Sequence, residues 1–121
     1  NFHKYQTNSP NKLIVFWSAD CSHCEAIIKL LYEWHSQSNN TKKVDIIAIS
    51  LDETDTEINK WKNKKENLKN WYHILADGGV NSQIATDYYI LSTPVIFIVD
   101  AKTNKIVDMP TSIEEILKIV D

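Results

Sequence analysis

Two kinds of hydrophobic pattern alternate along this chain. Largely apolar, β-branched runs are typical of strands buried on both faces, and they occur at Leu13–Trp17, Val44–Ile49 and Pro94–Val99. After the first two runs, apolar residues recur at helical spacing, from Asp20 to about Ser36 and later to about Leu68. This alternation predicts an α/β domain whose sheet is covered by helices on both faces.

The remaining expected elements are short. They are an outer strand at Phe2–Gln6, an extended piece at Trp71–Leu75, a brief helix at Asn81–Asp87, a turn at Asp100–Asn104, an edge strand at Lys105–Val107 and a final helix at Ser112–Val120. Asp52 or Thr54 is expected to cap the helix that ends near Leu68, because both residue types favour N-cap positions.

Length and charge limit the number of domains and the classes of partner that this chain can have. The 121 residues suit a single domain over 1–121, and the absence of an initiator Met suggests a piece excised from, or the mature C-terminal part of, a longer chain. The formal net charge of -3 argues against a nucleic-acid partner, which normally requires a basic surface. No apolar run approaches the ~18 residues of a membrane span, so none is expected in this segment.

The two cysteines carry the candidate chemistry. Cys21 and Cys24 stand three positions apart, where the first buried run gives way to the helical pattern. Unpaired N–H groups and the helix dipole stabilise a thiolate at a helix N-terminus. Because the second cysteine follows about one helical turn later, the sulfurs can meet and form a disulfide. The pattern predicts thiol–disulfide exchange.

Three other interpretations remain open. A CxxC pair also binds zinc, but the other candidate ligands, His3, His35 and His73, are scattered, so no metal is expected. A peroxiredoxin-type peroxidase would need a loop with Pro and Thr before its cysteine, and none precedes Cys21. A non-catalytic binding module with vestigial cysteines is the alternative from a different class.

Four segments together resemble the thioredoxin superfamily, in particular its TlpA/ResA-like (AhpC/TSA) branch of cell-envelope proteins. They are Val15–Cys24, Ile49–Glu53, Trp71–Leu75 and Tyr89–Asp100. The resemblance implies a thioredoxin-like fold with a central mixed sheet, and an oxidoreductase that exchanges disulfides with protein thiols. It also implies a recycling redox partner, no cofactor besides the Cys21–Cys24 disulfide, and a location in the periplasm or cell envelope.

The resemblance also assigns roles to individual residues. Cys21 would attack the substrate and Cys24 would resolve the mixed disulfide. Pro94 would be a cis-proline facing the cysteines, with Thr93 presenting its backbone to an extended substrate segment. Trp17 corresponds to the tryptophan beneath the active site, where plain core packing is the other interpretation.

Three positions depart from the family pattern. Val15 stands where thioredoxins carry a buried Asp, so that proton-transfer role is vacant or moved. Asp20 replaces a Trp and is expected to be a helix N-cap or a proton relay, although its charge would oppose a neighbouring thiolate. His23, when protonated, would favour the Cys21 thiolate, unless it only faces solvent. The sequence does not rank Asp20 against His23, nor does it give the direction of electron flow.

Overall fold

The computed structural model describes residues 9–37, 44–90, 92–103 and 105–120. Its elements, in chain order, are β1 (Asn11–Trp17), α1 (Ser22–His35), β2 (Val44–Ser50), α3 (Asp55–Lys65), β3 (Tyr72–Leu75), the 3-10 turn η2 (Gly79–Asn81), α4 (Gln83–Asp87), β4 (Val95–Asp100), β5 (Ile106–Asp108) and α5 (Ile113–Val120). The three long strands lie where the apolar runs predict them. The expected strand at Phe2–Gln6 falls outside the described residues.

The strands form one mixed sheet in the order β3-β2-β1-β4-β5. β1 and β2 pair in parallel, as do β2 and β3, whereas β4 runs antiparallel to both β1 and β5. β1 therefore lies at the centre, and its residues from Lys12 to Trp17 are all buried. The α/β class and the mixed sheet expected from the sequence are confirmed.

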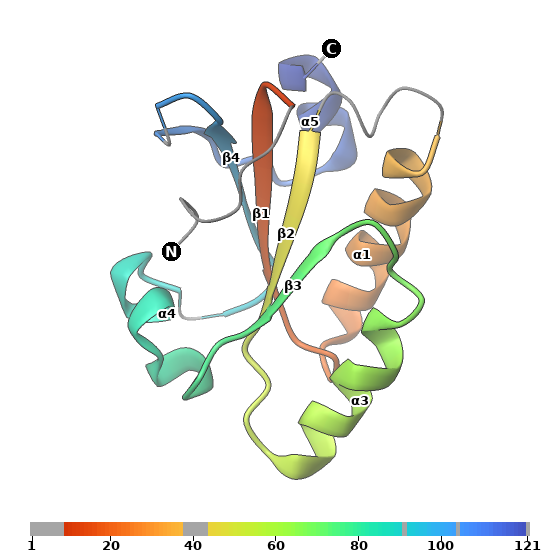
Figure 1. Ribbon diagram of the computed structural model, residues 1–121, viewed down its shortest axis with the longest axis vertical. Helices are drawn as coiled ribbons and strands as arrows, with labels where there is room; N and C mark the ends of the chain where they lie inside the picture. Colours follow the sequence, from red (N-terminus) through yellow and green to blue (C-terminus); the bar gives the residue numbers. More distant parts are fainter. Residues whose placement is uncertain (1–8, 38–43, 91, 104, 121) are drawn as a thin grey trace.

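Alternation along β1 divides the core into two layers. Leu13, Val15 and Trp17 pack with residues of α1, α3 and α5, whereas Ile14 and Phe16 pack with Ala85 of α4 and other residues on the opposite face. Figure 1 shows α1 and α3 on one side of the sheet and α4 on the other. Among the described helices, none is long and apolar enough to cross a membrane.

A capping box starts α3. The Thr54 hydroxyl accepts from the Glu57 N–H at 3.1 Å, and the Glu57 carboxylate accepts from the Thr54 N–H at 3.0 Å. Of the two expected caps, Thr54 is therefore right and Asp52 is wrong. The helix ends at Lys65 rather than near Leu68 because the N–H groups of Asn67 and Leu68 turn back to carbonyls three residues earlier.

Two histidine side chains are shielded from solvent near β2 and β3: His35, at the end of α1, is buried, and His73, on β3, is half-buried. The imidazole of His35 lies 2.8 Å from the Val44 carbonyl oxygen, and that of His73 lies 2.9 Å from the Leu68 carbonyl oxygen. Both rings contact the indole of Trp71, His73 by stacking and His35 edge-on. Burial lowers the pKa of both imidazoles below the ordinary 6.5, because a charged ring would lose hydration among these aromatic side chains.

Acid should therefore destabilise the fold before carboxylates titrate. Below the unfolded-state pKa near 6.5, the unfolded chain binds protons that the two folded imidazoles resist, so stability present above pH 6.5 is lost as the pH falls. We expect the melting temperature to fall between pH 7 and pH 5, and the double variant His35→Gln/His73→Gln to flatten this dependence. The exposed His23→Gln is the matched control. An equally steep profile in the double variant would contradict the explanation.

Candidate functional site

The first cysteine caps the helix that carries the second. Cys21 occupies the N-cap position of α1 with an extended backbone, and its Sγ lies 3.2 Å from the backbone nitrogen of Cys24, which donates to it. Both cysteines are free thiols. Sulfur thus takes the place that a Ser or Asp oxygen usually fills at a helix start, and the predicted junction between strand and helix is confirmed.

The two thiols differ in burial and therefore in acidity. Cys24 is completely buried, and burial together with its hydrogen bond to Cys21 raises the pKa of its thiol to about 12. Partial burial also raises the pKa of Cys21. Hydrogen bonds from the Cys24 thiol, the Thr93 side chain and the first backbone N–H groups of α1 outweigh that effect and hold the Cys21 pKa below its ordinary value. The thiol of Cys21 at the helix start is thus the more acidic of the two, and the buried thiol of Cys24 resists ionisation.

The segment before β4 faces the same sulfur. The carbonyl oxygen of Thr93 lies 3.7 Å from Cys21 Sγ, at hydrogen-bond distance for a thiol donor. The Thr93–Pro94 peptide bond is cis. Cys21 and Thr93 are 72 positions apart in the chain, and they meet because β4 pairs antiparallel with β1.

The Asp20 carboxylate pairs with a lysine of α3. Its Oδ1 lies 2.5 Å from Lys60 Nζ on α3, and this contact lowers the pKa of the Asp20 carboxyl. The expectation that Asp20 is the helix N-cap is wrong, because Cys21 itself holds that position. The side chain is exposed, and a lysine ammonium offsets the negative charge that would otherwise oppose the thiolate.

A buried carboxylate that sequence reasoning missed supports the turn before Cys21. Asp52, only 2% exposed, accepts hydrogen bonds from the Ser18 hydroxyl at 2.7 Å, the Ala19 N–H at 3.1 and 3.2 Å, and the Ser50 hydroxyl at 2.5 Å. A signal was available in the sequence, because Asp52 closely follows the second buried run, as the cysteines closely follow the first. Residues after adjacent parallel strands meet at one sheet edge.

A groove borders the cysteine pair on the side of the cis-proline. It encloses about 450 Å³ and is mostly apolar, with lining residues His23, Ile27, Pro94, Val95, Ile96, Met109, Pro110 and Thr111. His23 is exposed at this groove, and its backbone N–H is one of the groups that lower the Cys21 pKa. The structure therefore brings His23 and Pro94 together beside the thiol.

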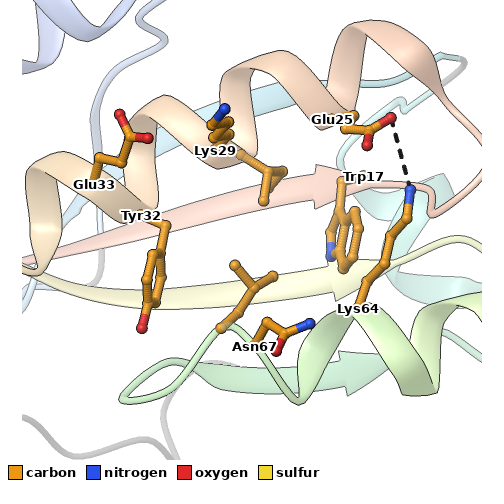
Figure 2. Close-up of a pocket in the computed structure, with 9 residues that line it drawn as sticks. Trp17, Glu25, Lys29, Tyr32, Glu33, Lys64 and Asn67 are labelled. Atoms are coloured by element: carbon orange, nitrogen blue, oxygen red, sulfur yellow. Dashed lines mark ion pairs between the residues drawn. The ribbon is translucent and has the colours of Figure 1, made fainter.

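Trp17 lines a second cavity. The indole is buried in the same core layer as Cys24 and lines a cavity of about 560 Å³ between α1 and α3 (Figure 2). At its rim, Lys64 Nζ lies 3.9 Å from Glu25 and donates to the Ala19 carbonyl oxygen at 2.7 Å. Neither cysteine lines this cavity.

Within the described parts of the chain, no group of three or more His, Cys, Asp or Glu side chains is placed to hold a metal ion.

Comparisons with known proteins agree with this architecture. A family model described as thioredoxin-like matches residues 12–106. The thioredoxin domain of a thiol-disulfide oxidoreductase from Bacteroides vulgatus is 24% identical, with a TM-score of 0.73 over 94% of this chain and 81% of that one. A thiol-disulfide oxidoreductase from Bacteroides fragilis is also 24% identical, with a TM-score of 0.68 over 94% and 82%.

A more distant neighbour is tryparedoxin I from Leishmania major, which is 21% identical, with a TM-score of 0.63 over 85% of this chain and 69% of that one. No curated protein matches the sequence. At these identities the structural neighbours show the fold, and the site has to be argued from its own geometry.

The difference in acidity predicts which thiol reacts. At pH 7 and in the folded state, iodoacetamide should alkylate Cys21 and leave Cys24 unmodified, because the thiolate is the nucleophile and the pKa of Cys24 is about 12. Mass spectrometry of the digested protein identifies the modified residue. Unfolding in denaturant should make both cysteines reactive. Preferential labelling of Cys24 in folded protein would contradict the assignment.

Proposed function

This chain belongs to the thioredoxin-like family, and we propose that it is a thiol–disulfide oxidoreductase that exchanges disulfides with protein cysteines through Cys21 and Cys24. The observation that carries the proposal is the asymmetry of the pair. An accessible thiol of lowered pKa caps a helix, and a fully buried thiol of raised pKa lies one turn behind it. Disulfide exchange requires one thiol that attacks the substrate and a second that later resolves the mixed disulfide.

The reaction proceeds in two displacements. The Cys21 thiolate attacks one sulfur of a substrate disulfide, forms a mixed disulfide and releases the other substrate sulfur as a thiolate. Cys24 then loses its proton and attacks Cys21 Sγ, which releases the second substrate thiolate and leaves the Cys21–Cys24 disulfide. Two electrons pass from the protein dithiol to the substrate, and both released thiolates take protons from solvent. The same steps in reverse oxidise a substrate dithiol.

The raised pKa of Cys24 is compatible with its resolving role. Burial is the largest cause of the raised pKa, and it persists in the mixed disulfide. Two further causes are the hydrogen bond that Cys24 shares with the Cys21 sulfur and the charge of that sulfur. These two causes disappear when Cys21 enters the mixed disulfide, because the sulfur becomes neutral and a poorer acceptor. Cys24 therefore ionises more readily at the step in which it must attack.

Substrate would bind along the groove beside the pair. Thr93 and Pro94 would present backbone to an extended segment of the substrate protein, and the apolar walls of the groove would hold its side chains. Trp17 would support Cys24 from below. The dithiol is itself the redox group, so the proposed reaction uses no organic cofactor or metal and depends on a partner that reduces or oxidises the pair.

The resemblance to cell-envelope relatives supports the finer parts of the proposal. They are a TlpA/ResA-like subtype and a location in the periplasm or cell envelope, which fractionation of the source cells would test. The direction of electron flow follows from the reduction potential of the pair. A value near ~-270 mV identifies a reductant and one near ~-120 mV an oxidant.

The activity is tested by insulin reduction with dithiothreitol. We expect the wild-type chain to accelerate precipitation of the insulin B chain, and Cys21→Ser to fall to the uncatalysed rate. Cys24→Ser should accumulate mixed disulfides through Cys21, because the resolving sulfur is absent. Ser22→Ala, which changes an exposed residue between the two cysteines, is the matched control. A chain that neither catalyses nor traps adducts would be a non-catalytic binding module.

The proposed role of His23 has its own test. A protonated imidazole beside the sulfur favours the thiolate, so His23→Ala should slow alkylation of Cys21 at pH 6. An effect that depends on imidazole protonation should shrink as the pH rises. Because the backbone N–H of residue 23 remains in the variant, the comparison isolates the side chain. Equal alkylation rates at pH 6 would eliminate the role.

A further inference from the structure

We propose that Asp52 is a positioning residue for the reaction: its buried carboxylate fixes the turn Ser18–Asp20, which sets the placement of both cysteines. The inference rests on the proposed function of the pair and adds a residue from another part of the chain. Three donors converge on the carboxylate, namely the Ser18 hydroxyl, the Ala19 N–H and the Ser50 hydroxyl.

The sheet register places Asp52 opposite the turn. Trp17 at the end of β1 pairs with Ser50 at the end of β2, and the Leu51 N–H donates to the Trp17 carbonyl oxygen at 2.9 Å. These backbone hydrogen bonds place the residues that follow Trp17 close to those that follow Ser50. The Ser50 hydroxyl oxygen also accepts from the Asp52 N–H at 3.1 Å, so Ser50 contacts both the backbone and the side chain of Asp52.

The turn transmits that position to both sulfurs. The Ser18 carbonyl oxygen accepts from the Cys21 N–H at 3.2 Å, and the Ser18 hydroxyl, while donating to Asp52, accepts from the Asp20 N–H at 3.3 Å. The backbone of Ser18 also makes a hydrogen bond that lowers the pKa of Cys24. One residue of the turn thus contacts Cys21 on one side and Cys24 on the other.

The bonding pattern fits a positioning role. The Ala19 N–H, which can only donate, and the hydroxyls of Ser18 and Ser50 all converge on the Asp52 carboxylate, so the side chain ties the turn to the end of β2. Without the carboxylate, the buried Ala19 N–H loses its acceptor, which is unfavourable for the turn in its present form. A turn that is no longer fixed cannot keep Cys21 at the N-cap.

The test measures the rate of Cys21 alkylation as a function of pH in Asp52→Asn, Ser18→Ala and the double variant. Asp55→Asn removes an exposed charge from the same segment and is the matched control. We expect each single variant to slow alkylation at pH 7 roughly three- to tenfold, since the thiolate fraction falls tenfold for each unit of pKa. The double variant should be no slower than the slower single variant, because both changes break one network.

Two results would overturn the proposal. Faster alkylation in Asp52→Asn would mean that the carboxylate acts on the thiolate by like-charge repulsion. Unchanged alkylation with only a lower melting temperature would mean that Asp52 serves stability alone. Ser18→Ala keeps the carboxylate and removes a single hydroxyl, so it remains informative if Asp52→Asn fails to fold. Alkylation needs no exchange activity, so a failed insulin assay would refute the proposed function without deciding the role of Asp52.

Discussion

The first backbone N–H groups of a helix have no partner within it, and at the start of α1 one of them points at the sulfur of Cys21. This contact satisfies an orphan donor of the helix and stabilises negative charge on the sulfur. The start of α1 and the acidity of the Cys21 thiol therefore depend on the same contact between the Cys24 N–H and the Cys21 sulfur. The position of the N-cap is in turn set by β1, whose fully buried residues fix where the chain leaves the sheet.

The difference between the two thiols follows from helix geometry. Cys21 precedes the first turn and faces the loop that carries Thr93, whereas Cys24 lies one turn further on and points into the core layer shared with Trp17 and Ala19. Two chemically identical side chains therefore have opposite pKa shifts. Burial dominates at Cys24, and donated hydrogen bonds dominate at Cys21. No special residue type is required for this asymmetry.

Local patterns are sufficient to predict the long strands, the junction between β1 and the helix that follows it, and the closeness of the two cysteines, because each depends on neighbours within a few positions. The support of the site could not be predicted in this way. Lys60 reaches Asp20 and Asp52 reaches Ser18 across 40 and 34 positions, and both contacts depend on how strands and helices pack. Sequence preference offers Asp20 as a helix N-cap or a proton relay, whereas the turn places Cys21 at the N-cap.

The same arrangement connects the redox state of the pair to the stability of α1. A thiolate at the N-cap accepts the Cys24 N–H strongly, whereas the sulfur of a disulfide is neutral and accepts it weakly. In the proposed reaction, oxidation would therefore weaken the start of the helix, and reduction would restore it. Any feature that strengthens the contact in the reduced protein would stabilise the reduced side of the equilibrium and make the disulfide a stronger oxidant. Asp52 and Lys64, which hold the turn in front of Cys21 from two directions, would then influence the redox balance without touching either sulfur.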